Sequence, residues 1–455
     1  MRILLISYYF PKDAAIGAVR PYHFARLLPQ FGITPWVLTV APEFAETWDE
    51  RFEIEGVPSE RIIRTHVGTT RRTRLIKKLS QLKNRLGRSS SEAKDAESEL
   101  LSPEQLQPAQ SAGWLEATPA RRLLLSWLRF PDELAGWHAA ALQAAEEAHK
   151  EFRFDAIVST SPPRVAHLIA RQLAERHSLR WIMDLRDPWH DEWNPIAPQS
   201  KSLTAQYRKL FDKCASRADV VVLNTERLRE HVIQRTPALA DKAITIPNGC
   251  ILQSSDALPS SAFPDRFSIG HYGNVYDQRS PEMFLQGLRL WLDSNEEAAR
   301  STSVHFIGQE FGNTLEHIHK LKLENFVTLS PPVPRNQVQS LMRADYLLLL
   351  IANGQPVQIP GKLYEYLSAR RRILTTTERD SATADLLNGA LHCPIAQTPA
   401  EVAASLQLLW DDYMRRISPD VDHSRLLNEC SYERRTERLA QALKKSAPPK
   451  RRDEG

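Results

Sequence analysis

The sequence YLLLLI at residues 346–351 is followed by a polar loop and then by PGKLYEYL at residues 360–367. An uninterrupted apolar run of this length is typical of a buried strand in a parallel sheet, and the second string predicts the start of a helix. A helix N-terminus that follows a strand offers an anion unpaired backbone N–H groups and the positive end of the helix dipole. The stretch therefore predicts an α/β fold with a junction suited to phosphate.

Two charged side chains, Lys362 and Glu365, stand in the first turn of this predicted helix. Lys362 can neutralise phosphate charge, and Glu365 can accept hydrogen bonds from vicinal hydroxyls such as those of a ribose. Together they indicate a nucleotide site. A capped surface helix with an acidic first turn would show the same string, so the choice between a nucleotide site and a surface helix depends on the rest of the chain.

Short apolar runs alternate with helical segments along the whole chain, which at 455 residues is long enough for two domains. The runs lie at residues 3–6, 35–40, 156–158, 181–183, 220–223 and 244–246, and then at 267–270, 304–307, 326–329, 346–351 and 373–375. Such strands between helices are typical of parallel sheets covered on both faces. The pattern predicts two doubly wound, Rossmann-like α/β domains facing a cleft, with ligands beyond the carboxyl ends of the strands.

Composition shifts predict the domain boundaries. The polar, proline-containing stretch 251–265 is expected to link a first domain, 1–250, to a second, 266–425. A polar segment at about 69–119 interrupts the alternation and is predicted to be an insertion. The chain closes with a short basic tail, 444–455.

The overall composition is that of a soluble globular protein, with 42% hydrophobic and 25% charged residues. No window holds the roughly 18 consecutive apolar residues of a spanning helix. The N-terminus has too short an apolar run for a signal peptide, so we expect a cytoplasmic protein. Cys214, Cys250, Cys393 and Cys430 show no paired spacing, so neither a zinc site nor a disulfide framework is expected.

Within the insertion, residues 71–88 are basic and carry leucines at helical spacing. An inserted helix that packs its leucines on the first domain would have this pattern, and so would a helix lying on an anionic membrane surface at the inner membrane face. Nucleic acid contact is not expected, because no aromatic residues interleave the cations.

The first predicted strand is followed by a loop with tyrosines and prolines, and then by Gly17 and Arg20 at the start of a helix. Gly17 would let another molecule approach the backbone closely, and Arg20 is expected to project from the first turn. The G-x-G-x-x-G fingerprint is absent, which argues against an enzyme that uses a nicotinamide or flavin dinucleotide.

The string DLRDPW at residues 184–189 places Asp184, Arg186 and Asp187 at the carboxyl end of another predicted strand. Charged groups there are costly unless they pair or meet a ligand. In a sugar-handling cleft, Asp184 or Asp187 could orient hydroxyls. A structural Arg–Asp pair is the alternative, and metal ligation by Asp187 with residues 190–192 is a third hypothesis.

Gly273, Asn274 and Arg279 follow the first strand of the second domain and precede a helix expected near residue 281. Arg279 supplies a permanent cation, so Arg279 and Lys362 could together hold a diphosphate. A solvated loop cation would give the same sequence.

Taken together, these strings resemble the retaining, family-four class of GT-B nucleotide-sugar glycosyltransferases, over almost the entire chain. Residues 362–367 look like the end of that family's E-x7-E signature, whose second glutamate binds the nucleotide ribose. Gly273 and Asn274 with Arg279 lie where the family holds the donor diphosphate. Residues 426–443, and 431–436 in particular, resemble the final helix that crosses back to the first domain.

The resemblance implies transfer of a sugar from a nucleoside diphosphate-sugar to a saccharide or lipid-linked acceptor with retention of configuration, in cell-surface polysaccharide or glycolipid synthesis and without a metal. It implies the following roles: Arg279, Lys362, Asp184 and Asp187 catalytic; Gly273, Asn274, Gly361, Leu363 and Glu365 donor-binding; Gly17, Arg20 and Arg186 on the acceptor side.

The chain departs from the family pattern at two positions. Val357 stands where the first signature glutamate is expected, so Gln355 or Gln358 would have to replace it, and Asn274 replaces the first of two cations. A nucleotide-sugar epimerase on the same fold and a non-catalytic sugar-nucleotide-binding scaffold are the alternative functions.

Overall fold

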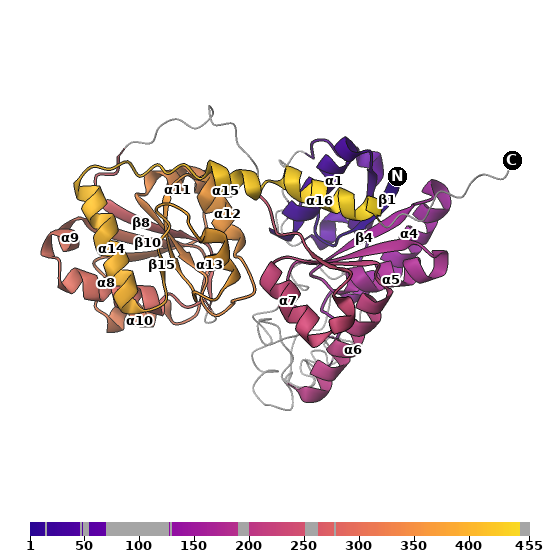
Figure 1. The fold of residues 1–455 in the computed structure, drawn as a ribbon, viewed down its shortest axis with the longest axis horizontal. Coiled ribbons are helices and arrows are strands. Elements are labelled where there is room, and N and C mark those ends of the chain that lie inside the picture. Colours follow the sequence, from indigo (N-terminus) through magenta and orange to yellow (C-terminus); the bar gives the residue numbers. More distant parts are fainter. Residues whose placement is uncertain are drawn as a thin grey trace, which may run out of the picture. The chain divides into compact units, whose positions relative to one another are not determined.

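The computed structural model describes residues 1–13, 16–45, 48, 54–69, 127, 130–189, 200–250, 263–276 and 279–445. It divides into two compact units (Figure 1). Unit 1 comprises Met1–Asn224, Val232–Ile246 and Thr436–Gly455, and unit 2 comprises Thr225–His231 and Pro247–Arg435. The prediction for residues 71–88 and most of the predicted linker lie outside the described residues.

The described part of unit 1 contains a parallel sheet of seven strands in the order β3-β2-β1-β4-β5-β6-β7. The strands are β1 (Arg2–Ile6), β2 (Thr34–Val40), β3 (Ile62–Thr65), β4 (Ala156–Ser161), β5 (Arg180–Leu185), β6 (Val220–Leu223) and β7 (Ala243–Thr245). Strand order reverses between β1 and β4, which is the topological switch point where such sheets bind ligands.

The α-helices whose residues belong to unit 1 follow or flank these strands. They are α1 (Val19–Leu27), α4 (His138–Phe152), α5 (Val165–His177), α6 (Lys201–Arg217), and parts of α7 (Glu226–Arg235) and α16 (Tyr432–Lys445). Short 3-10 turns are η1 (Ile16–Ala18), η2 (Leu28–Phe31), η3 (Pro42–Phe44), η4 (Ser59–Arg61), η7 (Ala135–Trp137) and η8 (Pro237–Leu239). Leu439 and Leu443 of α16 are buried in the same core as Ile3 and Leu5 of β1, so the C-terminal helix completes this core.

Buried Arg180 fixes the end of α16. Its guanidinium donates hydrogen bonds to the carbonyl oxygens of Ala442 and Leu443. The last carbonyls of a helix have no partner within the helix, so a buried arginine at this end satisfies them and holds the helix on unit 1.

Unit 2 repeats the architecture with six described strands in the order β12-β10-β8-β13-β14-β15, all parallel. The strands are β8 (Phe267–Tyr272), β10 (Thr302–Ile307), β12 (Val327–Ser330), β13 (Leu347–Ile351), β14 (Arg372–Thr376) and β15 (Ile395–Ala396). A separate parallel pair is formed by β9 (Val275–Tyr276) and β11 (Glu310–Phe311). Here the switch point lies between β8 and β13.

Helices cover the sheet of unit 2 on both faces (Figure 1). They are α8 (Glu282–Asp293), α9 (Glu296–Ser301), α10 (Thr314–Lys320), α11 (Arg335–Ala344), α12 (Gly361–Ser368), α13 (Ala382–Leu387), α14 (Pro399–Met414) and α15 (Ser424–Glu429). Along β13, Leu347 and Leu349 pack in the core that includes α8 and α14, whereas Leu348 and Leu350 pack in the core that includes α12. Burial on both faces explains why this strand is apolar at every position.

One prediction from the sequence is confirmed at this level. Both main sheets are parallel and alternate with helices, as the α/β class requires. All four cysteines fall within the described ranges and are buried free thiols. No helix in the described ranges is both long and apolar enough to cross a membrane.

Candidate functional site

The predicted donor residues meet at the carboxyl ends of β8 and β13 in unit 2. Gly273 directly follows β8, and the stem of Lys362, from the first turn of α12, lies against it. A Cβ placed on Gly273 would be 3.2 Å from Cε of Lys362. The structure thus brings together two strings that are almost ninety positions apart in the sequence, at the switch point of the sheet.

Arg279 is tied to the loop that leads into α12. Its Nη2 donates a hydrogen bond of 2.7 Å to Oε1 of Gln355, which is itself buried. This contact ties the second predicted cation to the loop that runs from β13 to α12, the helix that carries Lys362.

Lys362 and Glu365 form a partly exposed ion pair near the N-terminus of α12. Nζ of Lys362 donates to Oε2 of Glu365 over 2.9 Å, and the side chains are 35% and 32% exposed. An ammonium has three donors and a carboxylate has about four acceptor positions, so one mutual bond leaves capacity for a ligand on both groups.

The other predicted donor-binding residues organise the backbone. Oδ1 of Asn274 accepts a hydrogen bond of 3.1 Å from the backbone N–H of Gln309, just before the β9–β11 pair. Gly361 is the first residue of α12. Leu363 is buried and its N–H donates to the carbonyl oxygen of Pro360, so its side chain anchors the helix in the core.

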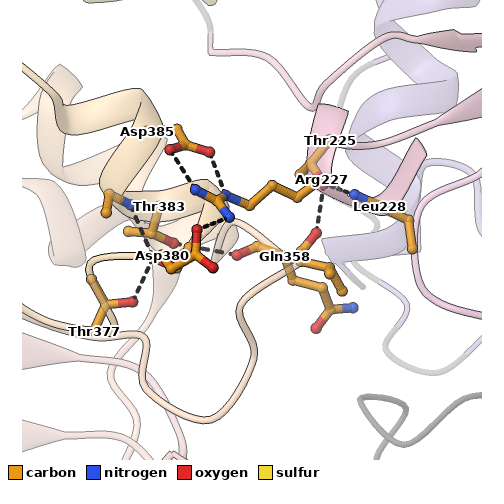
Figure 2. Close-up of polar contacts among 11 residues, drawn as sticks. Thr225, Arg227, Leu228, Gln358, Thr377, Asp380, Thr383 and Asp385 are labelled. Carbon is orange, nitrogen blue, oxygen red and sulfur yellow. Dashed lines mark hydrogen bonds and ion pairs between the residues drawn. The ribbon is translucent and has the colours of Figure 1, made fainter. Parts of the chain in front are cut away.

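The loop that holds Val357 is fixed from inside unit 2. Val357 is 5% exposed, and its carbonyl oxygen accepts a hydrogen bond of 2.5 Å from Oγ1 of Thr225 (Figure 2). Next to Thr225, Arg227 pairs with both Asp380 and Asp385. The position at which the resemblance expects the first signature glutamate is therefore a buried loop position in this chain.

In unit 1, Arg20 and Asp184 form a buried ion pair. Arg20 donates to the two carboxylate oxygens over 2.7 and 3.0 Å, and both side chains are only 2% exposed. Oγ1 of Thr160 also donates to Asp184, and Arg20 donates to the carbonyl of Ile246. The structure favours the structural Arg–Asp pair over the predicted catalytic role of Asp184 and the predicted acceptor-side role of Arg20, because neither side chain reaches the surface.

Arg186 is also buried and joins the loops at the switch point of unit 1. Its guanidinium donates to the carbonyls of Gly17, Ser161 and Pro162 over 2.6 to 2.9 Å. Burial lowers the pKa of Arg186 from the usual arginine value. A Cβ on Gly17 would lie 2.9 Å from the ring of Tyr9 and 3.2 Å from Arg186, so Gly17 makes room for the protein's own side chains.

Asp187 is the acidic residue of this string that is exposed at the surface. The metal hypothesis combined it with residues 190–192, which lie outside the described ranges. Among the residues that the structure describes, no group of three or more His, Cys, Asp or Glu side chains is arranged to hold a metal ion.

Two residues at the unit 2 site were missed by the sequence reasoning. His271, on β8, donates from Nδ1 to the carbonyl of Leu349 over 2.9 Å. Burial, with a smaller contribution from the positive charge of Lys362, lowers the pKa of His271 to about 4, so its ring is neutral near pH 7. Glu378, just after β14, accepts a hydrogen bond of 2.7 Å from the N–H of Gly354. Each stands at or just past the end of a strand, which is the signal that could have identified it.

Comparison with known proteins supports the fold. Residues 91–249 match the family described as glycosyl transferase 4-like domain. Sucrose-phosphate synthase from Thermosynechococcus elongatus is 11% identical, with 98% of each chain covered and a TM-score of 0.59. The chain has the GT-B fold. The predicted fold is thereby confirmed across nearly the whole chain.

Two other structures with this fold are a glycosyltransferase from Rickettsia africae and Anabaena HepE in complex with UDP. The first is 12% identical, covers 98% of this chain and 99% of its own, and has a TM-score of 0.55. The second is 13% identical, covers 97% and 99%, and also has a TM-score of 0.55. No curated protein sequence matches the chain. The family match and the GT-B fold together support the prediction of a nucleotide-sugar-dependent glycosyltransferase.

Proposed function

We propose that this chain transfers a sugar from a nucleoside diphosphate-sugar to a saccharide or lipid-linked acceptor, with the donor bound on unit 2. The observation that carries the proposal is the convergence of Gly273, Arg279, Lys362 and Glu365 at the β8–β13 switch point. The crystal structures of Anabaena HepE with UDP and with UDP-glucose support a donor of this class.

The chemistry follows from the charges at this site. Negative charge builds on the diphosphate as the bond to the sugar breaks and the sugar gains oxocarbenium character. Arg279, Lys362 and the N-terminus of α12 stabilise that charge without needing a metal. The acceptor hydroxyl attacks the anomeric carbon from the leaving-group face while a phosphate oxygen receives its proton, so the configuration is retained. No protein nucleophile is assigned.

Calorimetry with nucleoside diphosphates, one base at a time, tests the donor site. We expect the wild-type chain to select one base, and Arg279→Ala and Glu365→Ala to bind it at least tenfold more weakly, as loss of a charge-assisted hydrogen bond predicts. Arg300→Ala, on the exposed face of α9, is the matched control. If no nucleoside diphosphate binds the wild-type chain, the site assignment fails.

A non-catalytic nucleotide-sugar-binding protein is the second candidate, because Val357 is buried and Asn274 is bonded to Gln309. This candidate predicts binding without turnover. Incubation of the bound diphosphate-sugar with mixed saccharide and lipid-linked acceptors separates the two: a new glycoside supports the transferase, and intact donor with every acceptor favours the binding protein. An epimerised donor in the absence of acceptor would favour neither and point to the epimerase.

We further propose, from the sequence alone, that the basic segment 71–88 brings the enzyme to anionic membranes that carry lipid-linked acceptors for polysaccharide or glycolipid synthesis. Co-sedimentation with anionic vesicles tests this. A chain without residues 69–119 that binds the vesicles as well as the intact chain would refute it.

A further inference from the structure

A carboxylate that the proposed mechanism does not use lies at the donor edge of unit 2. Strand β14 pairs with β13 through Ile351 and Thr376, so the loops after both strands begin side by side. Glu378, two residues after the end of β14, accepts a hydrogen bond of 2.7 Å at Oε1 from the backbone N–H of Gly354. The next residue, Gln355, is the one that holds Arg279. Glu378 thus contacts the residue that directly precedes the anchor of the proposed diphosphate cation, and the Cα atoms of these two loop residues are about 4 Å apart.

Glu378 differs from the neighbouring carboxylates because it has no ion-pair partner among the described residues. Glu365 is paired with Lys362, and Asp380 and Asp385 are paired with Arg227 (Figure 2). Glu378 is partly buried, yet within the described residues it forms no ion pair. Its remaining contact is a long one, 3.5 Å, from Oγ1 of Thr377 to Oε2. A partly desolvated carboxylate with unused acceptor positions is costly unless hydrogen-bond donors reach it.

The charge of Glu378 restricts what can bind next to it. A diphosphate is repelled by a carboxylate and attracted by Arg279 and Lys362, so the phosphates belong near the cations. The group that extends from the diphosphate towards Glu378 must therefore carry no negative charge and be rich in hydrogen-bond donors. A hexose has both properties, since each of its hydroxyls can donate a hydrogen bond to a carboxylate oxygen.

We propose that Glu378 binds hydroxyl groups of the sugar in the nucleoside diphosphate-sugar, and that it therefore selects which sugar is transferred. This inference rests on the proposed function. It assigns the nucleoside diphosphate to Arg279, Lys362 and Glu365, and the sugar to the loop after β14.

The test compares the affinity for a nucleoside diphosphate with that for its diphosphate-sugars. Calorimetry with UDP, GDP, ADP, CDP and dTDP first identifies the base, and the commercially available diphosphate-sugars of that base follow. Each is titrated into the full-length wild-type chain, Glu378→Gln and Glu297→Gln. Glutamine keeps the shape of the side chain and an oxygen for the N–H of Gly354, but it removes the charge. Glu297 is an exposed carboxylate of α9 in the same unit and serves as the control.

We expect Glu378→Gln to bind the nucleoside diphosphate within twofold of wild type, and to bind the preferred diphosphate-sugar about tenfold to hundredfold more weakly, the range for loss of a charged hydrogen bond. An equal loss of affinity for the nucleoside diphosphate and the diphosphate-sugar would overturn the proposal, because Glu378 would then only position the loop at Gly354 to which Arg279 is bonded. An unchanged affinity for both ligands would overturn it as well. Failure of every nucleoside diphosphate to bind the wild-type chain is a different result, since it refutes the proposed function itself.

Discussion

Replacement of Asp184 by asparagine should destabilise unit 1 strongly and leave donor binding intact. Asparagine has the shape of aspartate and keeps an oxygen for Oγ1 of Thr160. The substitution removes the negative charge and replaces one of the two oxygens that accept from Arg20 by an amide donor. Arg20 then carries a positive charge at 2% exposure with no carboxylate, although its bond to the carbonyl of Ile246 remains. Breaking a buried ion pair by removing one partner costs about 3–5 kcal/mol.

For a unit of this size, that loss corresponds to a fall of about 6–20 °C in the midpoint of thermal unfolding. Differential scanning calorimetry of the full chain measures it, and Glu175→Gln is the control, because the exposed pair of Glu175 with Arg171 should contribute less than about 0.5 kcal/mol. The nucleoside diphosphate selected by the wild-type chain should bind the folded variant with unchanged affinity. An unchanged midpoint, or a normal midpoint with lost activity, would refute the structural role and restore the catalytic role for Asp184.

Three further predictions concern unit 2. The pKa of His271 is lowered in the folded chain, so the unfolded chain binds more protons than the folded chain between about pH 6.5 and 4. The stability of the fold is therefore full above this window and falls as the pH drops through it. His271→Asn should flatten the fall in the thermal unfolding midpoint measured from pH 7 to pH 5. Gly308→Ala should destabilise unit 2 by at least about 2 kcal/mol in urea unfolding, because its Cβ would lie 2.1 Å from the carbonyl oxygen of Gly273. Val357→Glu should lower both the thermal midpoint and the affinity for nucleoside diphosphate instead of restoring a signature residue, because it buries a charge; a gain in turnover would contradict this reading of the loop.

The sequence predicts the strands well, because a strand buried on both faces must be apolar at every position. Leu347 to Leu350 are an example: alternate residues enter different cores, and no substitution by a polar residue would be tolerated on either side. The same reasoning locates the ends of strands, and hence Gly273, Lys362 and Glu365. Local sequence does not reveal which side chains pair across the fold. Arg20 and Asp184 are 164 positions apart in the sequence. Because they pair with each other, both are buried, and without this pairing both could contact a ligand.

The segment 225–231 shows a second limit of sequence reasoning. It lies within residues 1–250, where the sequence predicts the first domain, yet it groups with unit 2. There Thr225 is bonded to the loop at Val357, and Arg227 is paired with Asp385 of α13. Nothing in its spacing distinguishes it from an ordinary strand-to-helix connection. Glu378 was missed for a related reason. It is a candidate ligand-binding residue because it forms no ion pair among the described residues, whereas Glu365, Asp380 and Asp385 do. Only the structure shows these pairings.

The two units share one strand order and use their charges in opposite ways. At the switch point of unit 1, the guanidinium groups of Arg20 and Arg186 are buried and donate to a carboxylate and to backbone carbonyls within the unit. At the switch point of unit 2, Lys362 and Glu365 remain about one-third exposed and hold each other by a single bond. A buried cation whose donors are satisfied internally gains nothing from an external anion, whereas a partly exposed cation next to a helix N-terminus does. Both units share this topology, and the difference in burial of their cations supports the proposal that the anionic donor binds to unit 2.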